Sequence, residues 1–437
     1  MRGLSGESVT TGSSSVSDKS PKGDGGAEHG KESHGGRGYL PALDGLRGIA
    51  ILLVVIYHCS ELVHLKTTGN PFDWFTWRVF QLGWIGVDLF FVLSGFLITG
   101  ILIESKSKPR YYQTFYARRS LRIFPLYYVV VFFTFFVFPQ IADVIASKSA
   151  SAAEALAELP PLEGKLPWYL FYASNFLAAL DGNMGHRLLA VTWSLAIEEQ
   201  FYFVWPLIIY VCRQKTVLVI SWAMVVIAFV CRFAMVVAIR EGYWDGNRTG
   251  PYVLPFCRMD ALAVGAIISV MWRQPGKIEW LRIWSKRVVL FGLPFFLLAI
   301  LTGRFGNRDG FVQTFGFSLL AFFFGGILVL TLLLKENGKV YRMVTNGGLL
   351  QIGKFAYAIY LFHLPLMFGL QALWFKNFLN LKLVGSSIPS LLIFISVVTA
   401  AVFIAAKLSW IFIERPFLKM KRFFPSSSDS VSAQRET

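Results

Sequence analysis

The chain has 437 residues, of which 55% are hydrophobic and 16% are charged, whereas an ordinary soluble domain is roughly 25% charged. This composition excludes an ordinary soluble protein and predicts an all-α, polytopic membrane protein. The net charge of +16 is the charge expected of basic loops beside anionic lipid headgroups. We therefore expect contact with membrane lipids and no nucleic-acid partner.

Apolar stretches long enough to cross a bilayer recur along the chain and predict about ten transmembrane helices. They lie at 48–65, 83–103, 121–144, 191–212, 216–239, 256–273, 287–303, 311–334, 352–376 and 388–414. A shorter apolar stretch, 166–180, better fits an interfacial or re-entrant segment. Residues 1–38 are rich in Gly, Ser and charge and lack the apolar core of a signal peptide, so we expect a disordered tail there and another over 424–437.

Basic residues concentrate in alternate short loops, which indicates the orientation of the chain. These clusters begin at Lys106, Arg213, Arg273 and Lys335, and the intervening loops hold fewer Lys and Arg. Cytoplasmic loops of membrane proteins carry the excess of such residues. We therefore expect the N-terminal tail and the C-terminal tail, 418–437, to be cytoplasmic.

Two ionisable residues in the first apolar stretch share one helical face. They are Arg47 and His58, in the sequence ALDGLRGIAILLVVIYHCSEL, and their spacing is three helical turns plus about 20°. At 1.5 Å rise per residue, His58 would lie near the middle of the stretch and roughly 16 Å deeper than Arg47, about half of a ~30 Å hydrocarbon core.

An ionisable group at that depth is rare and usually lines a cavity, so we predict a catalytic role for His58; a packed structural histidine is the alternative. A neutral imidazole can take a proton from a hydroxyl near neutral pH. Arg47 taken alone would be an interface anchor.

Arginines open the third predicted helix, in the sequence FYARRSLRIFPLYY. Arg119 and Arg122 are three residues apart and share a face, with Arg118 adjacent, so they predict a multi-donor fork suited to phosphate or diphosphate. The alternative is the ordinary positive charge of a cytoplasmic loop. The position of the cluster, at the end by which a cytoplasmic anion would reach His58, favours phosphate binding.

Two consecutive carboxylates interrupt the fourth predicted helix, in TWSLAIEEQFYFVWP. Glu198 aligns at helical spacing with Ser194 and Tyr202, which predicts a polar stripe that faces inward. Glu198 would either orient the catalytic histidine or pair with an arginine such as Arg258.

The remaining buried ionisable residues are predicted to be supports. Asp88 lies near the outer end of the second helix, and Arg258 and Asp260 lie at the outer end of the sixth, where a mutual or cross-helix ion pair is expected. His363 precedes Pro365, whose missing N–H kinks the helix, and is expected to line a cavity. Small residues that permit close packing of the second helix are Gly83, Gly86 and Gly95. The scattered histidines and cysteines predict no metal site.

Six short motifs follow one another along the chain: LDGLRGIA, GVDLFFVLSGFLI, RRSLRIFP, WSLAIEEQFY, RMDAL and ERPF. In this order and at these spacings, over about residues 39–417, they resemble the acyltransferase-3 family of integral membrane acyltransferases. The Trp that usually precedes the ninth-helix histidine in that family is Phe362 here.

The resemblance implies transfer of an acyl group, commonly acetyl, from acyl-CoA to a hydroxyl of a carbohydrate or glycoside. It also implies a multi-pass protein of the inner or plasma membrane. Some relatives carry an extracytoplasmic hydrolase-like domain. Because this chain ends just after the tenth predicted helix, we expect direct acylation of the acceptor.

These lines of reasoning combine into one hypothesis. Arg119 and Arg122, with Arg47, would hold the phosphates of CoA while the pantetheine arm reaches up between the first and third helices. His58 would act as general base on the acceptor hydroxyl, with Glu198 positioning the imidazole. A proton-coupled transporter that uses buried His and Glu groups is the alternative, and a non-catalytic receptor or scaffold is disfavoured by the arginines near a buried histidine.

Overall fold

The computed structural model describes residues 40–62, 70–148, 156–157, 159–244, 248–303, 305–372, 382 and 385–425. These residues belong to one compact unit that begins at Leu40. The predicted disordered segments, 1–38 and 424–437, lie outside the described residues apart from Phe424 and Pro425.

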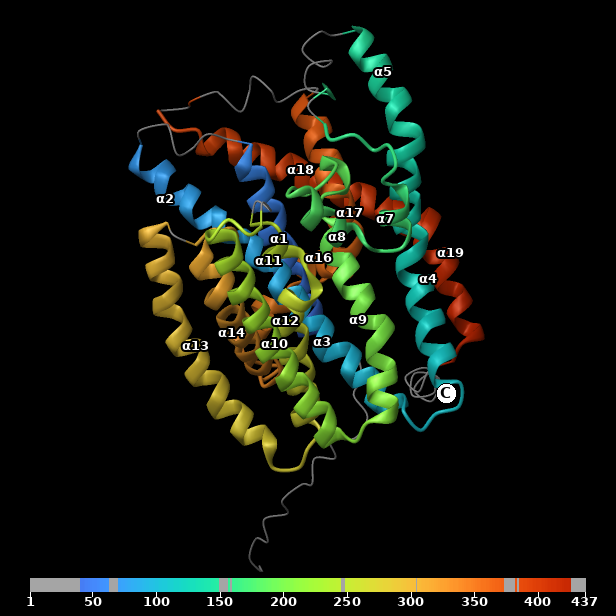
Figure 1. Ribbon diagram of the computed structural model, residues 1–437, viewed down its shortest axis with the longest axis vertical. Coiled ribbons are helices and arrows are strands. Elements are labelled where there is room, and N and C mark those ends of the chain that lie inside the picture. Colours follow the sequence, from blue (N-terminus) through green and yellow to red (C-terminus); the bar gives the residue numbers. More distant parts are fainter. Residues whose placement is uncertain are drawn as a thin grey trace, which may run out of the picture. The chain divides into compact units, whose positions relative to one another are not determined.

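Helices make up this unit, and its described residues contain no β-strand (Figure 1). The long helices are α1 (Pro41–Glu61), α3 (Gly86–Ser105), α4 (Tyr111–Phe132), α9 (Thr192–Val211), α10 (Gln214–Arg240), α12 (Pro255–Trp272), α13 (Lys277–Thr302), α14 (Phe317–Leu332), α17 (Ala356–Leu370) and α18 (Ile388–Ser409). The shorter helices are α2 (Pro71–Phe80), α5 (Phe138–Lys148), α7 (Leu166–Leu170), α8 (Ser174–Asp181), α11 (Gly250–Val253), α15 (Lys339–Val344), α16 (Gly347–Lys354) and α19 (Arg415–Lys419). Each predicted membrane segment corresponds to one of the long helices.

Eight helical segments among the described residues are long and apolar enough to cross a membrane, or nine if α16 and α17, bent by 77°, form one span. Helix α9 corresponds to a further predicted span but is not among them, because Glu198, Glu199 and Gln200 lower its hydropathy. The chain is therefore a multi-pass membrane protein. Cytoplasmic placement of both termini stays a prediction.

The first, third and seventh predicted spans begin earlier than predicted, the seventh at Lys277, where α13 begins. Helix α1 begins at Pro41, because the fixed φ and missing N–H of proline suit the first turn of a helix. The helix ends at Glu61, so His58 lies in its last turn, and the prediction of a mid-helix histidine is wrong. Helix α4 begins at Tyr111, so its arginines lie within the helix and not at its start.

The apolar stretch 166–180 contains all of the short helix α7 and all but the last residue of the short helix α8. They contain five and eight residues, respectively, whereas a membrane-spanning helix needs about 20. The stretch does not cross a bilayer as a helix, in agreement with the prediction.

Glycines bring α3 and the turn before it close to neighbouring helices. A Cβ atom at Gly95 would lie 2.0 Å from the backbone oxygen of Leu262 in α12. At Gly86 it would lie 2.4 Å from the backbone oxygen of Ala50 in α1, and Gly83 is equally confined at 2.2 Å from another α1 carbonyl. Only glycine permits this approach, so the predicted packing role of the three glycines is confirmed.

Two buried ion pairs join α12 to the helices on either side, α3 and α10. Arg258 Nη2 lies 2.8 Å from Asp88 Oδ1, and Arg232 Nη2 lies 2.9 Å from Asp260 Oδ2. All four side chains are buried. Buried charges in a membrane protein are normally paired with one another, and these four form two pairs. The prediction of a cross-helix ion pair is confirmed. Since Arg258 pairs with Asp88, the alternative pairing of Arg258 with Glu198 is wrong.

Candidate active site

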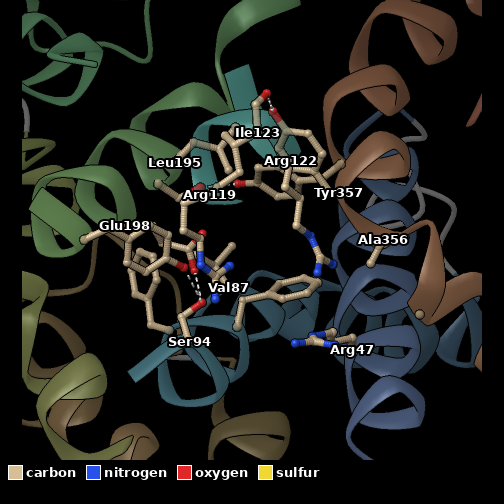
Figure 2. A pocket seen from close by; sticks show the side chains of 16 residues that line it. Arg47, Val87, Ser94, Arg119, Arg122, Ile123, Leu195, Glu198, Ala356 and Tyr357 are labelled. Carbon is tan, nitrogen blue, oxygen red and sulfur yellow. Dashed lines mark hydrogen bonds between the residues drawn. The ribbon is translucent and has the colours of Figure 1, made fainter. Parts of the chain in front are cut away.

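A cavity with about 780 Å³ of empty space, which includes the part open to solvent, lies among α1, α3, α4, α9 and the start of α17. We call it the arginine cavity. Figure 2 shows the guanidinium groups of Arg47, Arg119 and Arg122 directed into it. Arg119 and Arg122 share a face of α4 because they are three residues apart, and Arg47 comes from α1, where it pairs with Asp44. The three groups therefore converge on one space, although they come from distant parts of the chain.

Arg118 does not line the arginine cavity. Its Nη1 donates a hydrogen bond to the backbone oxygen of Phe424, at 3.0 Å. The adjacent residue in a helix points about 100° away, which separates Arg118 from Arg119. The structure thus divides the predicted fork into two cavity-lining arginines and one that contacts the C-terminal segment.

The polar stripe of α9 faces inward, as predicted, and its residues Ser194, Glu198 and Tyr202 all line the arginine cavity. Ser94 of α3 donates a hydrogen bond to Glu198 and accepts one from the Tyr202 hydroxyl at 3.0 Å. The Arg119 guanidinium lies 5.2 Å from the centre of the Tyr202 ring, a cation–π distance. The stripe therefore provides fixed polar groups opposite the arginines.

A second and larger cavity, with about 1430 Å³ of empty space that includes the part open to solvent, contains His58 in its wall. We call it the histidine cavity. The aromatic side chains of Trp84, Trp193 and Tyr252 line it, together with polar groups such as that of Glu61. His58 is thus accessible from a space that can hold a sizeable ligand.

The two cavities share part of their lining. Val87 of α3 and Tyr360 of α17 line both of them, so a single layer of side chains separates the two spaces. The Tyr360 hydroxyl lies 2.6 Å from Ser194 Oγ and 3.2 Å from the backbone oxygen of Val191, which fixes the ring in this wall. Val87 and Tyr360 are therefore the side chains at which the two cavities adjoin.

His58 is in contact with a second histidine. Its Nδ1 lies 3.0 Å from the backbone oxygen of Val54 and 3.1 Å from Nε2 of His363. His363 is 0% exposed, and its own Nδ1 lies 2.7 Å from the backbone oxygen of Tyr360. The structure places His363 against the imidazole of His58 and in the wall of neither cavity, so the expectation that it lines a cavity is wrong. Glu198, which was predicted beside the imidazole, contacts Ser94.

Sequence reasoning missed three residues of the site: Ser94, Val87 and Tyr360. Ser94 is a hydroxyl in an otherwise apolar run, and such a residue in a membrane helix indicates an inward-facing contact. Tyr360 lies three residues before His363, at the spacing that puts two side chains on one helical face. Nothing in the sequence distinguishes Val87 from the other apolar residues of α3. It belongs to the site only because α3 lies between the two cavities.

A metal site is not found among the described residues, which contain no group of three or more His, Cys, Asp or Glu side chains able to hold an ion. The charges that line the arginine cavity are those of its guanidinium groups and of Glu198. The chemistry of the site is therefore that of an anion-binding cavity beside an imidazole.

The fold and the two cavities define a polytopic membrane protein with a site between its helices. Residues 40–410 match a protein family described as an acyltransferase domain. The match covers most of the chain, and the chain belongs to this family, acyltransferase-3.

Similar proteins include the O-acetyltransferase OatA of Staphylococcus aureus strain COL. It is 27% identical over 403 residues, which cover 87% of this chain and 57% of the relative. A putative O-acetyltransferase of the same strain, SACOL0978, is 26% identical over 401 residues, which cover 87% of this chain and 58% of the relative. The chain thus spans just over half the length of these curated relatives. No solved structure matches it.

Proposed function

We propose that the protein is a membrane O-acyltransferase that moves an acyl group, in the simplest case acetyl, from acyl-CoA to a hydroxyl of a carbohydrate or glycoside. One observation carries the proposal: an arginine-lined cavity and a histidine-lined cavity meet at Val87 and Tyr360. Membership of the acyltransferase-3 family supports it. The names of the similar proteins, O-acetyltransferases, support the hydroxyl as acceptor.

The donor end of the reaction belongs in the arginine cavity. Guanidinium groups bind phosphate through paired, charge-assisted hydrogen bonds, and Arg47, Arg119 and Arg122 present three of them together. With the predicted topology this cavity faces the cytoplasm, where acyl-CoA is available. The pantetheine arm then extends toward Val87 and Tyr360, which brings the thioester to the wall between the cavities.

The acceptor end belongs in the histidine cavity, whose aromatic and polar lining suits the apolar faces and hydroxyl groups of a sugar. His58 removes the proton from an acceptor hydroxyl as its oxygen attacks the thioester carbonyl. The tetrahedral intermediate collapses with formation of the ester and cleavage of the C–S bond. The imidazolium then returns its proton to the departing CoA thiolate, which leaves CoA and the acylated acceptor.

The test uses membranes that contain the full chain and are supplied with acetyl-CoA labelled in its acetyl group. We expect loss of the thioester and transfer of the label to the glycan fraction. The variant His58→Ala is expected to lose transfer and to retain CoA binding, because the imidazole lies outside the arginine cavity. Unchanged transfer by this variant would remove His58 from the mechanism. A proton-coupled transporter would leave the thioester intact.

A further inference from the structure

The two adjoining histidines form a chain that ends on backbone carbonyl groups. His363 Nδ1 faces the oxygen of Tyr360 at 2.7 Å, and His58 Nδ1 faces the oxygen of Val54 at 3.0 Å. Between the rings, His363 Nε2 and His58 Nδ1 are 3.1 Å apart, and the ring centres are 5.0 Å apart. All three contacts are within hydrogen-bonding distance.

Carbonyl oxygens only accept hydrogen bonds, so they determine which ring nitrogens carry protons. The Tyr360 carbonyl requires a proton on Nδ1 of His363, which leaves Nε2 of that neutral ring as an acceptor. The Val54 carbonyl requires a proton on Nδ1 of His58, and this nitrogen is also within hydrogen-bonding distance of His363 Nε2, which can accept from it. The opposite pair of tautomers would place a lone pair against each carbonyl. The arrangement therefore leaves Nε2 of His58 unprotonated.

We propose that His363 is a positioning residue that holds His58 in the tautomer whose Nε2 accepts the proton of the acceptor hydroxyl. This inference rests on the proposed role of His58 as general base. His363 acts through its Nε2 lone pair and does not touch the substrate, because it is 0% exposed and lines neither cavity. When His58 becomes an imidazolium, the same lone pair receives a charge-assisted hydrogen bond from Nδ1.

The expected cost of losing His363 is limited by the second acceptor on His58 Nδ1, the Val54 carbonyl. That oxygen keeps some of the correct tautomer, but it leaves the ring freer to rotate and the imidazolium less well stabilised. General base catalysis contributes about 10²–10⁴-fold, and we expect loss of part of this, about 10- to 100-fold in kcat.

The test compares His363→Leu with His363→Gln in the purified full-length protein, with acetyl-CoA as donor and membrane glycan as acceptor. Glutamine can donate to the Tyr360 carbonyl and accept from His58 Nδ1, whereas leucine does neither. We expect the Leu variant to lose about 10- to 100-fold in kcat with an unchanged KM for acetyl-CoA, and the Gln variant to recover most of the loss.

The control variant is His186→Leu. His186 is buried and lines neither cavity. Burial, together with the positive charges of Arg187 and Lys165, lowers the pKa of His186 to about 4, so this control is a buried, neutral histidine. Its replacement is expected to leave kcat unchanged. An equal loss in this variant would mean that buried histidines are needed only for packing, which would overturn the proposal.

Two measurements keep the inference falsifiable if the Leu variant is poorly folded. CoA binding reports whether the arginine cavity is intact, and the ¹⁵N spectrum of ring-labelled histidine reports the tautomer of His58, assigned by comparison with His58→Ala. A wild-type spectrum with the proton of His58 on Nε2, full activity of the Leu variant, or equal loss in the Leu and Gln variants would each overturn the positioning role. If instead His58→Ala keeps full transfer, the proposed role of His58 as general base fails and the inference fails with it; if the wild-type protein transfers no label, the proposed function itself fails.

Discussion

Donor binding depends on the guanidinium groups of the arginine cavity, and the variant Arg122→Ala measures the contribution of one of them. A hydrogen bond to a charged group is worth about 1.5–3 kcal/mol, which corresponds to roughly 10- to 150-fold in Kd. The Arg122 side chain is exposed, so water and salt screen part of this interaction. We therefore expect the lower end of the range, about a tenfold weaker affinity for CoA.

The assay is equilibrium binding of CoA to the purified protein at two salt concentrations, with Arg118→Ala as the matched control. Arg118 lies on the same helix and carries the same charge, but it contacts the backbone of Phe424 and not the cavity. Its replacement is expected to leave the affinity unchanged. Equal weakening in the two variants would show that general positive charge, and not the converging guanidinium groups, attracts the donor. Unchanged affinity in Arg122→Ala would also refute the reasoning.

Two further predictions concern the wall and the packing of α3. Val87→Ala should raise the rate with butyryl-CoA relative to acetyl-CoA about tenfold, because methyl groups leave the wall between the cavities. Val92→Ala, in the same helix but lining neither cavity, should not change this ratio in a competition assay read by mass spectrometry. Gly95→Ala should lower the unfolding temperature and cost about 1–3 kcal/mol, since its Cβ would meet Leu262. Gly369→Ala, with open space around it, should not destabilise.

The helical class and most of the membrane segments could be predicted because they depend on local sequence. An apolar run of about 20 residues must form a helix in lipid to satisfy its own backbone hydrogen bonds. The side on which a residue lies follows from helical periodicity, which is why Ser194, Glu198 and Tyr202 face the cavity as predicted. The ends of α1 and α4 were less predictable, because polar first turns continue a helix beyond its apolar part.

The partners of the buried polar groups could not be predicted. His58 and His363 are 305 residues apart in the chain, and Ser94 and Glu198 are 104 apart. A buried carboxylate can pair with any buried arginine or histidine that lies near it in the fold, and the sequence does not show which of these residues are neighbours. The assignment of Glu198 to the imidazole failed for this reason.

Hydropathy and helical phase are local properties, so the sequence alone was enough to predict a helical membrane protein in which Arg119, Arg122 and His58 are unusual residues. The packing of the helices was needed to show that Arg118 is separated from the other arginines, that Val87 and Tyr360 stand between two cavities, and that His363 contacts His58. These relations depend on how α1, α3, α4 and α17 pack together, and packing distances of a few ångströms are set by many distant contacts at once.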